Sequence, residues 1–238
     1  MRTLTPSPVQ EGCFYMNKST ARVVLFVNGE LPAPDHVQAQ LTNNDMLIAV
    51  DGGLRHIESL GLSPNLIIGD LDSADPEKIQ AYHAQGVETK TFPADKDETD
   101  LELALQAACE LEPETIWVVA ALGNRLDQTL ANIFLLTLPD LVNFNIRLFD
   151  GQTEVFLIRE SGVIQGEIGQ RVSLLPIHGL AEGIYTEGLK YTLSDETLYP
   201  EKTRGISNEM SSSTATVHLK NGLLLCIRET TKITERFG

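Results

Sequence analysis

Two aspartates lie two positions apart in the stretch IIGDLDS, at the end of an apolar run. Ile67 and Ile68 are typical of a buried strand, and Gly69 separates them from Asp70 and Asp72. Carboxylates this close repel each other, and a strand end against a core solvates them poorly. A cation would offset the repulsion, and oxygen ligands supplied by aspartate favour Mg²⁺ over zinc or copper. We therefore expect a magnesium site at this strand end.

Three further polar turns flank predicted elements. One follows the apolar run 46–50, one follows the run 115–122, and one precedes a helical segment that begins near Thr99. Their polar and glycine residues are Asp51, Gly52, Gly53, Asp95, Lys96, Asp97, Asp100, Gly123, Asn124, Arg125, Asp127 and Gln128. Ligands of open parallel sheets bind beyond the carboxyl ends of the strands, so four turns that converge there predict one site.

The residue types in these turns suit phosphate chemistry. Glycines let backbone N–H groups approach a phosphate, and Lys96 and Arg125 would neutralise charge on transferring phosphoryl oxygens. With a magnesium site, the set predicts a nucleotide-using phosphoryl or pyrophosphoryl transferase. Each turn taken singly also has a structural explanation, such as a tight turn at 51–53 or a surface ion pair between Arg125 and Asp127. Neither G-x-x-x-x-G-K-[ST] nor a G-x-G-x-x-G after the first strand occurs.

The elements that must position these turns alternate between strands and helices. Short apolar runs predict strands at 22–28, 46–50, 65–69, 115–122 and 145–150. Helical spacing predicts helices over 100–111, with a capping box from Thr99 to Glu102, and over 126–136, and Pro76 opens a further helix-like stretch. The second helix carries an apolar face of Leu126, Leu130, Ile133 and Phe134. This alternation predicts a parallel sheet covered on both faces.

After residue 150 the pattern changes to strands alone. Segments 154–160, 170–177 and 214–229 predict strands, and Lys220-Asn221-Gly222 between two alternating runs predicts a β-hairpin. We therefore place a domain boundary near 150–153. Three parts are expected, namely a loose extension at 1–20, an α/β catalytic domain at 21–151 and a smaller all-β domain at 152–238.

The composition excludes several classes of partner and site. The 238-residue chain has 42% hydrophobic residues and a formal charge of -15, which argues against nucleic acid or an anionic membrane surface as the main partner. Cys13, Cys109 and Cys226 lie far apart without a CxxC or Cys/His cluster, so neither a disulfide framework nor a zinc site is expected. No apolar stretch has the length of a membrane span or the pattern of a signal peptide. We expect a cytoplasmic protein.

Six segments resemble the thiamine pyrophosphokinase family and occur in the family's order. They are AVDGGLRHI (49–57), PNLIIGDLDS (64–73), DKDETDLELAL (95–105), GNRLDQTLANI (123–133), GLKYTLSD (188–195) and GISNEMSSSTATV (205–217). The resemblance implies transfer of the pyrophosphoryl group of ATP to the hydroxyl of thiamine, which gives thiamine diphosphate and AMP, with Mg²⁺ as cofactor. It also implies a Rossmann-like parallel-sheet domain, then a smaller β-sandwich domain that binds thiamine, and a homodimer with active sites at the subunit interface.

The resemblance also implies roles for individual residues. The family's magnesium-binding acids correspond to Asp70, Asp72 and Asp100. Asp51, Asp97 and Asp127 correspond to further polar positions at the catalytic edge, and Lys96, Arg125 and Gln128 to positions beside the phosphates. Ser207 and Asn208 would hydrogen-bond the aminopyrimidine of thiamine, and Tyr191 stands where some members have tryptophan. Asp100 or Asp127 would accept the proton of the attacking hydroxyl.

Three other functions remain open on the residues alone. A pyrophosphokinase for another heterocyclic alcohol, such as a pterin, would share the α/β half, and Ser207 and Asn208 are the residues that discriminate it. A magnesium-dependent phosphohydrolase would also use Asp-x-Asp, although its nucleophilic aspartate is usually followed by threonine rather than by the Leu71 found here. A non-catalytic sensor of thiamine diphosphate or of a nucleotide would release no AMP.

Overall fold

The structure is a computed structural model that describes residues 22–70, 76–92, 97–123 and 125–232. The expected extension at 1–20 lies outside these residues. The helices are α1 (Pro34–Gln38), α2 (Leu54–Ser59), α3 (Pro76–Ala84), α4 (Asp100–Cys109) and α5 (Leu126–Leu135), with the short 3-10 helices η1 (Asp51–Gly53) and η2 (Pro139–Leu141). The strands of the first half are β1 (Arg22–Phe26), β2 (Asp45–Val50), β3 (Leu66–Gly69), β4 (Glu88–Thr91), β5 (Thr115–Val119) and β6 (Ile146–Phe149).

Strands alone make up the second half of the described chain. They are β7 (Thr153–Ile158), β8 (Ser161–Gln165), β9 (Gln170–Pro176), β10 (Ala181–Glu187), β11 (Ser194–Leu198), β12 (Asn208–Glu209), β13 (Thr214–His218) and β14 (Leu224–Lys232). The sequence patterns predicted β7, β9, β13 and β14. They did not predict β8, β10, β11 and β12, of which β11 is largely polar and β12 has only two residues.

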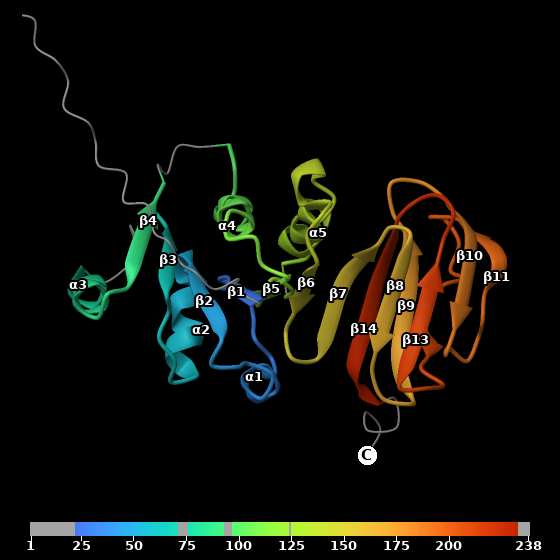
Figure 1. Cartoon of the computed structure of the whole chain (residues 1–238), viewed down its shortest axis with the longest axis horizontal. Coiled ribbons are helices and arrows are strands. Elements are labelled where there is room, and N and C mark those ends of the chain that lie inside the picture. The colour runs from blue at the N-terminus through green and yellow to red at the C-terminus, as the bar shows by residue number, and fades with distance from the viewer. Residues whose placement is uncertain (1–21, 71–75, 93–96, 124, 233–238) are drawn as a thin grey trace, which may run out of the picture.

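One ten-stranded sheet runs through the molecule, in the order β12-β9-β14-β7-β6-β5-β1-β2-β3-β4. Neighbouring strands from β6 to β4 are parallel, whereas β6 and β7 pair antiparallel, as do the strands beyond β7. A second sheet contains four antiparallel strands in the order β11-β10-β13-β8. Figure 1 shows the helical half on the left and the all-strand half on the right. The predicted parallel sheet is confirmed, and the polar edge strand β4 is added to it.

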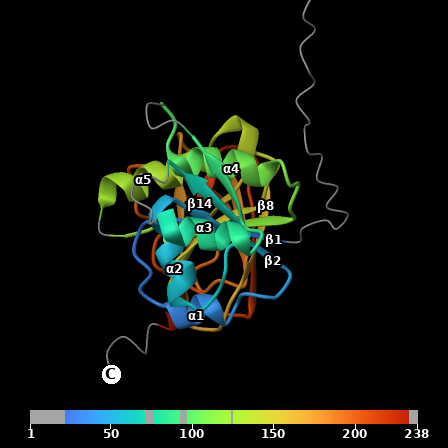
Figure 2. The same cartoon turned by 90° about the vertical axis from the view of Figure 1, so that its left-hand side faces the viewer.

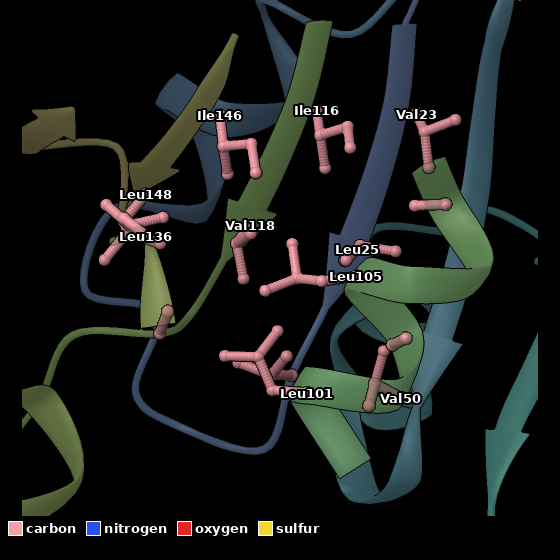
Figure 3. Packing of buried hydrophobic residues seen from close by; sticks show 14 of the residues in the cluster. Val23, Leu25, Val50, Leu101, Leu105, Ile116, Val118, Leu136, Ile146 and Leu148 are labelled. Carbon is pink, nitrogen blue, oxygen red and sulfur yellow. The ribbon is translucent and has the colours of Figure 1, made fainter. Parts of the chain in front are cut away.

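Helices cover both faces of the parallel half, as the sequence predicted. One face forms a core with α4 and α5 in which Val23, Leu25, Ile116 and Leu105 are at most 1% exposed (Figure 3). The other face forms a separate core, with buried side chains from α1 and α2 and partly buried ones from α3. Figure 2 shows α4 and α5 on one side of the sheet and α1 and α2 on the other. Strands buried on both faces explain why the runs are apolar throughout.

The antiparallel half of the large sheet packs on the four-stranded sheet. Their shared core contains Phe156, Val172, Ile184, Val217 and Cys226, all of them buried. One layer of this β-sandwich is therefore a continuation of the central sheet rather than an independent sheet.

The hairpin predicted at 220–222 is wrong. The strands on either side, β13 and β14, belong to different sheets, so the turn crosses from one layer of the sandwich to the other. It is held by Glu182, whose carbonyl accepts from the N–H of Lys220 at 2.9 Å. Alternation with a glycine turn describes a strand–turn–strand segment, but it does not determine whether the strands pair or face each other.

A buried ionic cluster lies where the parallel half joins the antiparallel half. Glu154 on β7 is 7% exposed, and its two carboxylate oxygens accept from Arg147 on β6 at 2.8 Å and from Arg228 on β14 at 2.9 Å. The Arg147 guanidinium also lies 4.2 Å from the ring centroid of Phe156. Because removing one member would leave buried charge uncompensated, the cluster ties these three strands together.

The apolar face predicted on α5 exists, but most of it is not covered. Leu126 is 68% exposed, Leu130 is 45% exposed and Phe134 is 50% exposed, whereas Ile133 packs against the core. We call Leu126, Leu130 and Phe134 the α5 stripe. No helix of the described residues is long and apolar enough to cross a bilayer.

Truncating the core side chain of α4 should destabilise the fold. Leu105→Ala removes a side chain that is 1% exposed, and we expect a loss of about 2–5 kcal/mol in the free energy of unfolding, measured by urea denaturation. The neighbouring exposed Gln106→Ala is the control, with an expected change within about 0.5 kcal/mol. Equal effects of the two substitutions would contradict the packing described for α4.

Candidate functional site

A cavity lies beyond the carboxyl ends of the parallel strands. Chain order builds outward from β1, through β2 to β4 on one side and through β5 and β6 on the other. A topological switch of this kind opens a crevice where ligands of α/β sheets bind. The cavity of about 400 Å³ lies at this switch and is lined by the segments after β1, β2 and β5 and by the first turns of α4 and α5. We call it the switch-point cavity.

Several sequence-predicted residues line this cavity, and others do not. Those that line it are Asp51, Asp100, Gly123, Arg125 and Gln128. The described residues Gly52, Gly53, Asp70, Asp97 and Asp127 are not among its lining residues. The remaining predicted residues, Asp72, Asp95, Lys96 and Asn124, lie outside the described part of the chain. The structure therefore brings together part of the predicted set at the predicted sheet edge.

Asp51 and Asp70 follow neighbouring strand ends. The register pairs Val50 with Ile68, and a Cβ built on Gly69 would lie 3.2 Å from the Cα of Asp51. Glycine thus lets the segment that carries Asp70 approach the one that carries Asp51. Asp51 itself has a φ of 49°, an uncommon conformation that clusters at functional sites.

Gly52 and Gly53 are needed for close packing at the end of β1. A Cβ on Gly53 would lie 1.8 Å from the carbonyl oxygen of Phe26, and one on Gly52 would lie 2.4 Å from Oδ1 of Asn28. This requirement explains the two glycines without a ligand. Their contact with a phosphate stays a prediction.

Sequence reasoning missed the residues that fix the walls of the cavity. Nη2 of Arg55 donates to the carbonyls of Asn28 and Gly29 at 2.8 and 2.9 Å, and Nε2 of His56 lies 2.9 Å from the same Gly29 oxygen. On the opposite wall, the Asn132 amide donates to the Ala121 carbonyl at 2.8 Å. Most of these contacts join residues far apart in the sequence, so local patterns could not predict them. The one local indication was Asn28-Gly29, which ends the apolar run of the first strand.

The first turn of α4 presents an acid at a helix N-terminus. The Thr99 hydroxyl accepts from the N–H of Glu102 at 3.2 Å, as the predicted capping box requires. Asp100 follows in the first turn, where the helix dipole favours a carboxylate. The cap therefore fixes the start of α4 and with it the position of the Asp100 backbone at the cavity.

Arg125 and Asp127 form an ion pair in which each side chain is 67% exposed, with Nη2 and Oδ2 2.5 Å apart. The hydrogen bond from Arg125 lowers the pKa of Asp127, and the same bond raises the pKa of Arg125. The surface ion pair that the sequence left open is thus present. Arg125 still lines the cavity, but a neighbouring carboxylate offsets its charge.

The predicted magnesium ligands can be tested only in part, because Asp72 lies outside the described residues. Among the described residues, no group of three histidine, cysteine or acidic side chains could hold a metal. The donors at this edge are nevertheless carboxylate oxygens, from Asp51, Asp70 and Asp100, which is the chemistry that Mg²⁺ prefers. The donor chemistry suits this metal, but the described residues do not by themselves gather three ligands, so the magnesium site stays a prediction.

A second cluster forms in the all-strand half. Oδ1 of Asn208 accepts from the N–H of Tyr191 at 3.0 Å, and its amide nitrogen donates to the Tyr191 carbonyl at 2.7 Å. Oδ1 also accepts from the N–H of Glu209, so one amide N–H of Asn208, a residue only 7% exposed, has no hydrogen-bond partner among the described residues. Ser207 has a φ of 57°, and its N–H donates to the hydroxyl of Ser173 at 3.0 Å. Tyr191 is 54% exposed. None of these residues lines the switch-point cavity.

Two family models match the chain. The model described as the catalytic domain of thiamin pyrophosphokinase matches residues 37–149, which contain the switch-point cavity lining from β2 onward. The model described as the vitamin B1 binding domain of thiamin pyrophosphokinase matches residues 161–224, which contain Tyr191, Ser207 and Asn208. Together the two matches span more than half of the chain.

Individual relatives agree with the family models. The chain is 31% identical over 185 residues to thiamine pyrophosphokinase from Bacillus subtilis, covering 77% of this chain and 86% of the relative. The crystal structure of thiamine pyrophosphokinase from Bacillus subtilis superposes with a TM-score of 0.78 at 27% identity, covering 88% of this chain and 99% of that chain. Yeast thiamin pyrophosphokinase has a TM-score of 0.68 at 17% identity, covering 92% and 90%, which is a likeness of fold alone.

Acid should destabilise the protein partly through His56 behind the cavity wall. Burial lowers the pKa of His56 below its ordinary value of 6.5, although the Gly29 carbonyl opposes the shift. The unfolded chain therefore binds more protons than the folded chain just below pH 6.5, so this stability is present above pH 6.5 and is lost as the pH falls through the folded pKa. We expect His56→Gln to lose less unfolding free energy than wild type on acidification, measured by urea denaturation at several pH values.

The control for losing an imidazole is His218→Gln, at an exposed position on β13. If the His56 variant kept the wild-type slope of stability against pH, the histidine would not carry this dependence.

Proposed function

Because the chain belongs to the thiamine pyrophosphokinase family, we propose that it transfers the pyrophosphoryl group of ATP to the hydroxyl of thiamine, which gives thiamine diphosphate and AMP. The observation that carries this function is the pairing of an acid-rich cavity at the sheet switch point with a separate Tyr191–Ser207–Asn208 cluster in the half that matches the vitamin B1 binding domain. One cluster suits a nucleotide and the other suits a small heterocycle.

The nucleotide is proposed to bind in the switch-point cavity. The cavity volume of about 400 Å³ lies within the range usual for small-molecule sites. Backbone N–H groups of the segment at Gly123 and the N-termini of α4 and α5 supply positive potential for phosphates. Gln128 and Arg125, which also line the cavity, are proposed to contact the phosphate chain, with Lys96 as a further candidate outside the described residues.

Magnesium is proposed to be held by Asp70, Asp72 and Asp100. When bound, it would neutralise negative charge on the phosphate oxygens of the nucleotide. The carboxylates at this edge would otherwise repel ATP, because the whole chain already carries a formal charge of -15.

The remaining residues are proposed to orient the reactants and to move one proton. The thiamine hydroxyl would attack the β-phosphorus in line, the bond to the α-phosphate oxygen would break, and AMP would leave with that oxygen. Asp100 or Asp127 would accept the hydroxyl proton. Asp100 lines the cavity and is also a proposed magnesium ligand, whereas Asp127 pairs with Arg125 at the surface, so the proposal keeps both as candidates.

Thiamine is proposed to bind at the cluster of Tyr191, Ser207 and Asn208. The exposed ring of Tyr191 offers a stacking surface, and the remaining N–H of Asn208 offers one donor. The other polar groups of the Asn208 amide hold the Tyr191 backbone, so this residue also positions the ring.

A homodimer with composite sites is proposed from the separation of the two clusters. The cavity lining ends at Asn132, so the lining includes no residue of the thiamine cluster from the same chain. The α5 stripe offers an apolar surface for a second copy, and the same helix lines the cavity through Gln128 and Asn132. A partner seated on this stripe would lie next to the cavity and could bring its own thiamine cluster there.

The domain division is proposed as residues 21–151 for the catalytic domain and 152–238 for the thiamine-binding β-sandwich. The change from parallel to antiparallel pairing between β6 and β7 supports this boundary. The strand order of the first part, with its switch between β1 and β5, supports a Rossmann-like arrangement.

The decisive experiment incubates the purified protein with ATP, Mg²⁺ and thiamine and follows both products by chromatography. We expect equal amounts of AMP and thiamine diphosphate, no AMP without thiamine, and no turnover after EDTA treatment. AMP formation with a pterin instead of thiamine would overturn the acceptor, and the absence of any nucleotide turnover would favour a sensor.

A paired substitution connects that reaction to the cavity. Asp100→Asn keeps the shape of the side chain but removes its charge, so turnover should fall by roughly 10²-fold or more. Exposed Asp140→Asn on η2 removes the same charge at a residue outside the cavity lining and should keep wild-type turnover.

Composite sites predict that two inactive variants restore each other. Asp100→Asn disables the nucleotide half, and Tyr191→Ala with Ser207→Ala disables the thiamine half. Random mixing gives half of the dimers one chain of each kind, each with one intact site, so activity should recover to about one quarter of wild type. Measured turnover of the mixture after co-refolding checks this. No recovery, while sedimentation shows that dimers form, would place both halves of a site in one chain.

A further inference from the structure

Arg55 lies in the first turn of α2 and lines the switch-point cavity, and neither the sequence patterns nor the resemblance gave it a role. A cation near a helix N-terminus opposes the helix dipole, so α2 gains no electrostatic stability from it. Helix electrostatics therefore do not explain why an arginine occupies this position.

The guanidinium of Arg55 is held in place by backbone oxygens. Its Nη2 uses both of its protons, one on the carbonyl of Asn28 and one on that of Gly29. The N–H of Nε points at Nε2 of His56, 3.4 Å away. The two N–H donors of Nη1 therefore remain without an acceptor among the described residues.

The positive charge of Arg55 is also uncompensated within the described part of the chain. Most other described arginines face a carboxylate, in the pairs Arg22–Asp45, Arg125–Asp127, Arg147–Glu154, Arg171–Glu229, Arg204–Glu196 and Arg228–Glu154. Arg55 has no such pair in the described residues and meets only carbonyl dipoles. In a chain with a formal charge of -15, an unpaired cation that faces a cavity favours an anionic ligand.

The braced segment makes this cation rigid. A Cβ on Gly29 would lie 2.0 Å from the carbonyl oxygen of Ala120, so the segment after β1 is wedged against the segment after β5. Arg55 is bonded to that wedged segment, so little side-chain entropy remains to be lost on binding a ligand.

We infer that Arg55 binds the phosphate chain of the nucleotide through its unused N–H donors. The fork geometry of a guanidinium matches phosphate oxygens, and such charge-assisted hydrogen bonds are stronger than neutral ones. This inference rests on the proposed nucleotide site. It adds a substrate-binding cation from the β2 side of the cavity, opposite the predicted Arg125.

The test compares binding of ATP, inorganic tripolyphosphate and adenosine to Arg55→Gln by calorimetry in the presence of Mg²⁺. Glutamine keeps an amide donor but has no charge and is shorter than arginine. We expect the affinity for ATP and for tripolyphosphate to fall roughly 10- to 100-fold while adenosine binding is unchanged. Arg55→Lys should recover part of the loss because the charge returns without the fork.

Arg204→Gln is the matched control, since it removes one positive charge from an exposed pair with Glu196 and should leave all three affinities unchanged. An equal loss for adenosine and ATP, or a lowered thermal midpoint with that loss, would make Arg55 a structural brace only and overturn the inference. Unchanged binding of ATP would overturn it as well. Failure to form thiamine diphosphate with normal ATP affinity in wild type would instead refute the proposed reaction.

Discussion

The antiparallel pairing of β6 with β7 is the contact on which the whole architecture depends. It converts a parallel sheet, which needs helices on both faces, into an antiparallel one that can be covered by a second sheet. The buried cluster around Glu154 reinforces this joint with charge, and the strands on both sides share one hydrogen-bonded ladder. The α/β half and the all-strand half are thereby joined in one continuous sheet.

The same sheet explains where the chemistry lies. Parallel strands deliver all their carboxyl ends to one edge, and the switch between β1 and β5 leaves a crevice there that helices cannot fill. Backbone contacts at Gly29 and Gly53 then draw the edge segments so close that side chains would collide. The cavity is shaped mainly by main-chain packing, and its charged groups are carried on that rigid frame.

Apolar runs predicted every buried strand of the parallel half, because burial on both faces leaves no polar alternation to obscure the pattern. They could not predict β4 or β11, whose polar residues are tolerated at sheet edges. Pairing was also beyond the local pattern, as the turn at Asn221 demonstrates. In the candidate site, the acidic turns could be predicted from their residue types and their spacing. Arg55 did not, because its importance arises from partners 26 and 27 positions away.

The shared ladder at the joint has a consequence for how the protein would work in a cell. A hinge between the two halves would break strand hydrogen bonds and expose the charges around Glu154, so such a motion would cost free energy. In the proposed composite site, reactants held by the two halves would meet through the assembly of two chains. The fraction of chains in dimers would depend on the concentration of the protein. The amount of active enzyme would therefore depend on the level of expression as well as on the level of substrate.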